Sequence, residues 1–305
     1  MVRFLIKRVV LGVFVMWFAT VVVFSLSRAA GDPRYLFVSE YSTREQWDEW
    51  GVRFGLDRSY PMQYLIWLGK AVRLDFGESL YFHDSAWKII PSRFAATFGL
   101  AAGAYTFALV VGIPLGMFSA LKRGSFVDLV GRSIALMGQA MPSFWLGMML
   151  ILLFSVHFGL LPTSGTGGWK HYVLPTVTLG WFPAAGLLRL VRSSMLETLD
   201  SEYIKLARAK GVPARKVILK HAFRNAALVP LTYAGILLSA FITGAVVTET
   251  VFSWPGLGRL SVQAVFNTDF PMLSALVLLF TAIFLVTNLL IDMMYVVIDP
   301  RIRIQ

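Results

Sequence analysis

The chain has 305 residues, of which 57% are hydrophobic and only 15% are charged, and its mean hydropathy is +0.67. Soluble domains carry about 25% charged residues, so this composition excludes both a water-soluble globule and a disordered chain. The sequence contains no cysteine, which excludes a disulfide scaffold, a thiolate zinc site and a cysteine nucleophile. We therefore expect an all-α, polytopic membrane protein.

Six charge-free windows are long enough to cross a bilayer, since a spanning helix needs about 20 largely apolar residues. They cover residues 9–27, 94–121, 133–156, 171–188, 225–248 and 270–291. The third window contains Pro142, which a membrane helix tolerates where neighbouring helices satisfy the freed carbonyl. The sequence thus predicts a bundle of six transmembrane helices.

The first window follows Arg3, Lys7 and Arg8, a charge pattern that secretory signals share. Its apolar run, residues 9–26, is longer than the roughly 7–15 residues of a signal core. We expect residues 1–28 to be a retained first transmembrane helix with its N-terminus in the cytoplasm.

A polar stretch, residues 29–92, separates the first two windows and is predicted to form a small extracytoplasmic subdomain. We expect short helices at 64–72 and 87–94, lying near the membrane interface. Trp47, Trp50 and Trp67 fit anchoring at the headgroup level better than ligand stacking.

The distribution of charge predicts the orientation, because cytoplasmic loops retain Lys and Arg. With six spans, the side that holds both termini carries 17 basic and five acidic residues, whereas the opposite side carries 11 of each. Both termini, including the tail 299–305, should therefore be cytoplasmic. This topology also accounts for the net charge of +11 without nucleic acid as a partner.

Residues 199–224 form a long basic loop on the predicted cytoplasmic side. Asp200 or Ser201 can cap a helix that ends near Lys210, Gly211 can take the left-handed conformation, and Pro213 prevents simple continuation. A second basic helix should then lead into the fifth span. The residues by themselves fit two roles equally well, a docking helix for a partner protein or a loop lying on anionic lipid headgroups.

A second notable loop, residues 251–271, lies on the predicted outer side. It is apolar but interrupted by Pro255, Gly256 and Gly258. It fits either a segment that dips partway into the bilayer or a plain interfacial loop.

No motif for catalysis is found in the sequence. A phosphate-binding G-x-x-x-x-G-K-[ST] run is absent, and the four histidines are scattered singly, so we expect no catalytic residue, no metal site and no cofactor in this chain. Gln139, Ser143 and Asn288 are polar candidates for a transport pathway inside predicted spans. Asp292 keeps an ion-coupled secondary transporter open as an alternative, although one carboxylate near a span end is weak support.

Several motifs, taken in order, resemble one family. The basic loop contains Lys205-Leu206-Ala207-Arg208-Ala209-Lys210-Gly211 and then His221-Ala222-Phe223-Arg224-Asn225. Further matches are Gly31-Asp32-Pro33, Gly55-Leu56-Asp57-Arg58, Gln63-Tyr64, Asp75-Phe76-Gly77-Glu78-Ser79, Phe252-Ser253-Trp254-Pro255-Gly256-Leu257-Gly258, Asp269-Phe270-Pro271 and Asp299-Pro300-Arg301. The chain resembles a B-type permease subunit of the ATP-binding-cassette importers, in the dipeptide, oligopeptide and nickel branch. It departs from the wider superfamily's Glu-Ala-Ala triplet at Lys205 and Leu206.

This resemblance implies a type I importer permease in a bacterial or archaeal plasma membrane, with residues 93–298 as its transport core. It implies pairing with a second homologous permease, two ATPase subunits that bind ATP and Mg, and an extracytoplasmic solute-binding protein. It assigns ATPase coupling to Lys205, Leu206, Ala207, Arg208, Ala209 and Gly211. The implied substrate is a di- or oligopeptide, with nickel or another small solute as the alternative.

Overall fold

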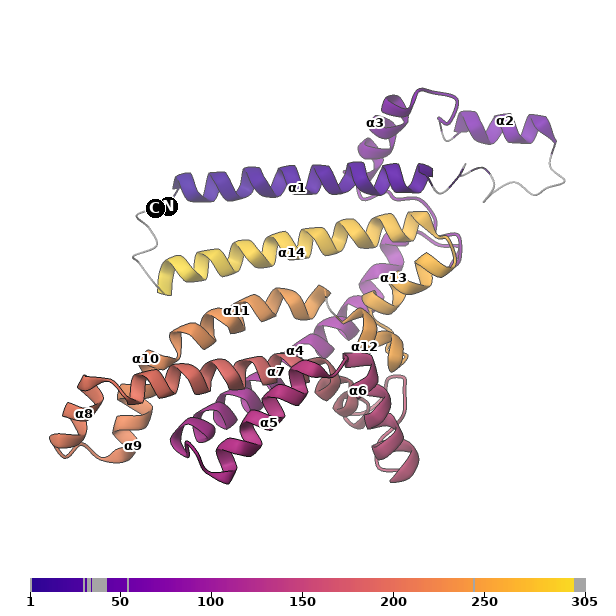
Figure 1. Ribbon diagram of the computed structural model, residues 1–305. Helices are drawn as coiled ribbons and strands as arrows, with labels where there is room; N and C mark the ends of the chain where they lie inside the picture. The colour runs from indigo at the N-terminus through magenta and orange to yellow at the C-terminus, as the bar shows by residue number, and fades with distance from the viewer. Residues whose placement is uncertain are drawn as a thin grey trace. The chain divides into compact units, whose positions relative to one another are not determined.

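The computed structural model describes residues 2–29, 31, 34, 43–53, 55–243 and 245–298. The described residues are mainly helical, with an isolated antiparallel bridge between Glu78 and Ser85 (Figure 1). They fall into two compact units, one with Leu260–Leu289 added to the N-terminal part up to Phe94, the other with Ala95–Arg259 and the described part of Leu290–Ile302. The predicted tail 299–305 and the Asp32-Pro33 dipeptide lie outside the described residues.

The first unit packs a short helix against the N-terminal one. Its complete helices are α1 (Val2–Ala29), α2 (Arg44–Arg53) and α3 (Tyr60–Ala71). The Thr20 hydroxyl on α1 lies 2.8 Å from the Tyr64 hydroxyl on α3, and the Phe24 ring centroid is 5.7 Å from that of Trp67. Packing against α1 therefore accounts for part of the Trp67 surface. The helix predicted at 64–72 is α3.

Two sequence motifs, far apart in the chain, meet at the start of α14 (Phe270–Ile298) in this first unit. The buried Ser79 hydroxyl donates to the buried Asp269 carboxylate, which also accepts from the Tyr81 backbone N–H at 3.4 Å. The same carboxylate accepts from the Met272 N–H at 3.2 Å, so it caps α14. Asp269 thus fastens the segment around Ser79 to a long helix.

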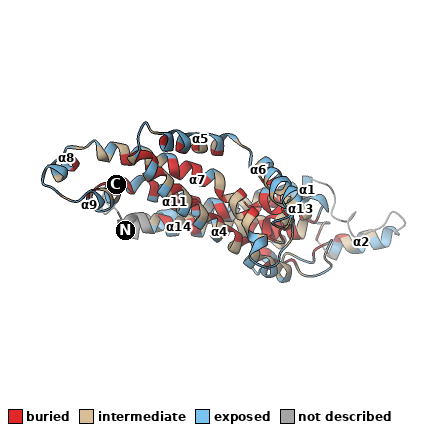
Figure 2. Ribbon diagram, turned by 90° about the horizontal axis from the view of Figure 1, so that it is seen from below, coloured by how far each residue is buried: buried red, intermediate tan, exposed pale blue. Residues whose placement is uncertain are grey.

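The second unit is built around α7 (Lys170–Leu199), in which residues 183–188 are all buried (Figure 2). Helices α4 (Ala86–Leu121) and α5 (Phe126–Ala140) approach it closely because glycines face it. A Cβ on Gly116 of α4 would lie 2.7 Å from the Leu188 carbonyl oxygen of α7. Small residues that admit close backbone approach are typical of helix interfaces in membranes.

The prediction of six unbroken spans is not confirmed in number. Four helices in the described chain are long and apolar enough to cross a membrane, or five if a bent pair counts as one span. The pair is α5 with α6 (Ser143–Leu150) and π-helix η2 (Ile151–His157), bent by 111°. The bend falls at Met141-Pro142 because the residue before a proline avoids helical dihedrals and Pro142 has no N–H to donate.

The fifth predicted window is also divided, into α10 (Arg224–Ala226), α11 (Leu228–Thr243) and the start of α12 (Val246–Val251). Pro230, which cannot donate a backbone hydrogen bond, stands in the first turn of α11. The apolar part of α11, Leu228–Leu238, is shorter than a full span. The prediction of a separate short helix at 87–94 was wrong in length. These residues are helical, but no helix-breaking residue follows them, and they form the first part of α4.

The segment predicted as a loop at 251–271 contains a helix, α13 (Leu257–Phe266), which is preceded by a buried turn. The Trp254 side chain is fully buried and donates its indole N–H to the Ala96 carbonyl at 2.9 Å. Glu249, also fully buried, accepts from the Thr97 hydroxyl at 2.7 Å and from the Arg259 N–H at 2.9 Å. A Cβ on Gly256 would collide with this carboxylate, so the turn requires glycine there.

Candidate functional site

The end of α7 leads into a short helix, α8 (Glu202–Ala209), and the chain then returns toward α11 (Figure 1). Ser201 stands at the N-cap with extended dihedrals, but its hydroxyl donates to the Thr198 carbonyl rather than capping the α8 backbone. Glu202 in the first turn suits the positive end of the helix dipole. The predicted short helix after Ser201 is thereby confirmed.

Gly211 closes α8 in the left-handed conformation, with φ of +72°. Its N–H donates to the Arg208 carbonyl at 3.0 Å, and the Val212 N–H donates to the Ala207 carbonyl at 3.2 Å. This pair of bonds is the Schellman pattern, which satisfies the last carbonyls of a helix. The prediction that Gly211 ends the helix in a left-handed conformation is confirmed.

A hydrophobic cluster fixes α8 to the neighbouring helices. Ile204 of α8 is fully buried and packs with residues of α4, α7 and the return segment. The buried members of the cluster are Ala120, Val191, Met195, Ile204, Val217, Ala222 and Ala226. Val212 beyond the turn and Ala207 pack against the same cluster. Helix α8 and the ends of α4 and α7 therefore form one packed body.

The opposite side of α8 is open to solvent. Leu206 is 55% exposed and Tyr203 is 44% exposed, large fractions for apolar side chains on a short helix. The predicted coupling residues on this exposed side are Lys205, Leu206, Arg208, Ala209 and Gly211. Ala207 is half-buried and faces the cluster, so its small size serves packing within this chain rather than the exposed surface.

The exposed surface carries strong positive charge. Residues 202–224 contain seven basic side chains, all exposed, and one acidic side chain, Glu202. Lys205 pairs with Glu202 at 2.7 Å. The return segment, α9 (Ala214–Lys216) and the π-helix η3 (Val217–Phe223), supplies three of the five basic side chains beyond α8. The other two are Lys210, directly after α8, and Arg224, at the start of α10. The Asn225 amide donates to the Tyr203 hydroxyl at 2.9 Å and ties this segment to α8.

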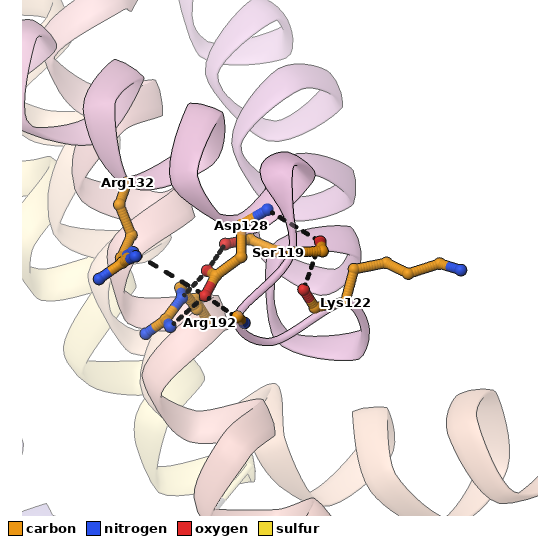
Figure 3. A network of polar contacts seen from close by, with 7 residues as sticks. Ser119, Lys122, Asp128, Arg132 and Arg192 are labelled. Carbon is orange, nitrogen blue, oxygen red and sulfur yellow. Dashed lines mark hydrogen bonds and ion pairs between the residues drawn. The ribbon is translucent and has the colours of Figure 1, made fainter.

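A buried carboxylate, Asp128, was missed by the sequence reasoning. Arg192 of α7 donates from Nε to one of its oxygens at 2.7 Å and from Nη2 to the other at 3.0 Å (Figure 3). The Asp128 carboxylate also accepts from the Ser119 hydroxyl at the end of α4, at 2.7 Å, and from the Gly124 N–H, at 3.0 Å. Arg132 lies at 3.8 Å. The signal available in the sequence was one acidic residue among the basic residues of the α4–α5 turn.

A cavity of about 420 Å³ lies at the bend between α5 and α6. Its walls come from α5, α6, α7 and α11, and the lining residues are Gln139, Ala140, Met141, Pro142, Ser143, Leu179, Phe182, Pro183, Leu237, Ala240 and Phe241. Pro183 has no N–H for the Leu179 carbonyl, so a polar backbone atom is left at a largely apolar wall. Broken helices that expose backbone groups at a cavity are a recurrent feature of transporter binding sites.

The cavity brings together two of the three predicted pathway residues, Gln139 and Ser143. Asn288 does not line it; the Asn288 amide donates to the Phe284 carbonyl one turn earlier on α14. Among the residues that the structure describes, no group of three or more His, Cys, Asp or Glu side chains is arranged to hold a metal ion.

Comparisons with known proteins agree with this architecture. The sequence matches the family described as "Binding-protein-dependent transport system inner membrane component" over residues 112–304, and that family's N-terminal part over residues 1–101. The chain belongs to this family and is a multi-pass inner-membrane protein.

Its relatives are permease subunits of transport systems. The dipeptide transport system permease protein DppB of Escherichia coli K12 is 37% identical over 338 aligned residues, covering 99% of both chains. The glutathione transport system permease protein GsiC of Pectobacterium atrosepticum is 41% identical over 249 residues, covering 82% of this chain and 81% of that protein.

Solved transporters share the fold. An inward-facing form of the MetNI methionine ABC transporter superimposes with a TM-score of 0.54 at 21% identity, covering 68% of this chain and 95% of that one. An amino acid ABC transporter crystallised with histidines superimposes with a TM-score of 0.53 at 17% identity, covering 68% of this chain and 92% of that one. The chain therefore has the fold of an ABC transporter permease.

Proposed function

We propose that this chain is the permease subunit of an ATP-driven importer of short peptides and supplies half of the translocation pathway. The observation that carries the proposal is the exposed, basic and partly apolar surface of α8, mounted on a packed body that reaches α4 and α7. Full-length similarity to permeases of peptide and glutathione systems supports the class of cargo, because glutathione is itself a short peptide.

In this proposal an ATPase subunit docks on the exposed side of α8. Leu206 and Tyr203 supply apolar contact, while Lys205, Arg208 and the following basic residues favour an acidic groove. Gly211 and Ala209 leave little bulk beside them and permit close approach. ATP and Mg are bound by two such partner subunits, and this chain takes no catalytic part.

The cavity at the α5–α6 bend is the proposed part of the pathway in this chain. Gln139 offers both a donor and an acceptor, and Ser143 offers a hydroxyl, which suits the amide groups of a peptide. The cavity walls carry no charged side chain. They therefore fit a permissive path, in which an extracytoplasmic solute-binding protein makes most of the selection.

The remaining parts of the assembly follow from the same proposal. A second homologous permease completes the pathway, and both termini of this chain lie in the cytoplasm. The excess of Lys and Arg on one set of loops supports this orientation, because cytoplasmic loops retain basic residues. The orientation places the surface of α8 in the cytoplasm, where ATP is available.

The test is purification of the intact complex through a tag on this chain, followed by reconstitution into vesicles. We expect ATPase subunits, a second permease and a solute-binding protein to copurify, and ATP hydrolysis to rise when binding protein and di- or tripeptides are added together. Nickel in place of peptide is the matched control. Uptake by this polypeptide alone, driven by a proton or sodium gradient, would contradict the proposal.

A further inference from the structure

We infer that Asp128 and Arg192 form a positioning pair, which transmits movement of α8 to α5 and so to the cavity at the α5–α6 bend. The inference rests on the proposed function, in which an ATPase subunit moves α8. Neither residue lines the cavity or belongs to α8, so their role is to hold one helix against another.

The pair links the two helices at a definite place. Arg192 lies two turns before α7 ends at Leu199, and the side chain of Asp128 stands in the first turn of α5. The two donors of the guanidinium fork meet the two carboxylate oxygens, at 2.7 and 3.0 Å. Such bidentate geometry fixes direction as well as distance, which a single point charge does not.

The rest of the interface explains why a fixed joint is needed there. The buried residues of α5 are Asp128, Gly131, Ala135 and Gly138. Three of these four are too small to interlock with a neighbouring helix, so packing brings α5 close to its neighbours but hardly prevents it from sliding. Asp128 is the one buried residue of α5 with a side chain that can lock its position along α7.

Helix α5 connects this joint to the pathway. Its first turn carries Asp128 and its last turn carries Gln139 and Ala140, which line the cavity. A helix of 15 residues is about 22 Å long at 1.5 Å per residue and behaves as a stiff rod. Displacement of α7 at Arg192 therefore reaches Gln139 with little loss.

Stability alone does not account for the pair. A buried ion pair adds little net stability compared with apolar residues of similar volume, since desolvation offsets the attraction. A second link nearby joins Arg123 of the α4–α5 turn to Asp200, the residue after α7, at 3.3 Å. It is exposed, with 66% and 71% of the side chains accessible. Exposed pairs contribute little, so Arg123 is a suitable control.

The experiment compares Arg192→Lys with Arg123→Lys in the complete complex, reconstituted in vesicles. Arg192→Lys keeps a charge beside Asp128, so the chain should still fold, but it removes the fork. We expect substrate imported per ATP hydrolysed to fall at least about fivefold, the lower end for coupling between two sites, while Arg123→Lys stays within about twofold. The double variant Asp128→Asn with Arg192→Met strands no buried charge, because Arg132, the other cation beside Asp128, is exposed. It should show a larger loss.

A second readout follows the movement itself. The chain has no cysteine, so spin labels can be attached at Leu136→Cys on α5 and Leu231→Cys on α11, both exposed positions. The distance between the labels should change on ATP trapping in the parent complex and stay constant in the double variant. Normal uptake per ATP in both variants, or an unaltered distance change, would overturn the inference. A parent complex without ATP-dependent uptake would instead refute the proposed function.

Discussion

The carboxylate of Glu249 stabilises the turn at residues 252–258, which the sequence identified only as a family motif. This carboxylate is fully buried, and it accepts from the Thr97 hydroxyl and the Arg259 N–H. Thr97 in turn accepts from the Leu257 N–H at 2.8 Å. The apolar turn around Trp254 therefore depends on a charged residue just before it, which composition alone does not reveal.

We predict that Glu249→Ala destabilises the chain, because each buried donor left without a partner costs about 1–3 kcal/mol. Glu249→Gln keeps an acceptor oxygen and should cost less. Thermal unfolding of the purified complex measures both, and Glu202→Ala, at an exposed carboxylate, is the control. Equal melting temperatures for the alanine variant and the control would contradict the assignment.

Gly211 is the residue at which backbone conformation and proposed coupling coincide. We predict that Gly211→Val lowers uptake without removing the chain from the membrane, because a side chain at φ of +72° costs about 1–2 kcal/mol. A cost of that size shifts the population of the native turn by about 5- to 30-fold.

No atom lies within 4 Å of the position that a Cβ at Gly211 would take, so the predicted effect comes from the backbone and not from a clash. Gly211→Asn is the matched control, since asparagine tolerates the left-handed region. ATP-dependent uptake in vesicles provides the measurement. Equal loss in the two variants would mean that the turn conformation is not what matters.

At the scale of the element, the sequence predicted helices better than their breaks. The charge-free windows located α1, α4, α7 and α14 because apolar length is a local property. The sequence predicted that one span would tolerate Pro142, whereas the structure bends there by 111°. Whether a proline bends or breaks a helix depends on which neighbours satisfy the freed carbonyl, and those neighbours come from distant parts of the chain.

We predict that filling the cavity at this bend blocks transport. Ala240→Phe places a ring among the lining residues and should reduce uptake at least about tenfold, while ATP hydrolysis persists. Ile236→Phe, an exposed position on the same helix outside the cavity lining, is the matched control. Uptake that survives Ala240→Phe would place the path elsewhere.

For the whole molecule, orientation is the property on which the proposed coupling depends. The absence of cysteine allows single labelling sites without background. We predict that Lys122→Cys, exposed in the α4–α5 turn, reacts with an impermeant maleimide only after the inner membrane is opened, whereas Glu78→Cys reacts in intact spheroplasts.

Glu78 is a better outer site than its neighbour Ser79, which is buried and bonded to Asp269. We expect this labelling pattern because loops rich in Lys and Arg remain in the cytoplasm during membrane insertion. The reverse labelling pattern would place α8 outside the cell and would remove any possibility of an ATPase docking on it.

The sequence by itself determined the all-α class, the short helix ended by Gly211 and the family resemblance, because each depends on neighbouring residues or on motifs in order. It also selected Gln139 and Ser143, which meet at one cavity, whereas Asn288 does not line that cavity. For the Asp128–Arg192 pair it offered only an acidic residue among basic ones and did not indicate the partner. The tertiary structure alone decided that Ala207 faces inward and that Asp128 meets an arginine 64 positions later. Contacts of that kind depend on how helices pack side by side, and periodicity along one helix does not specify its neighbour.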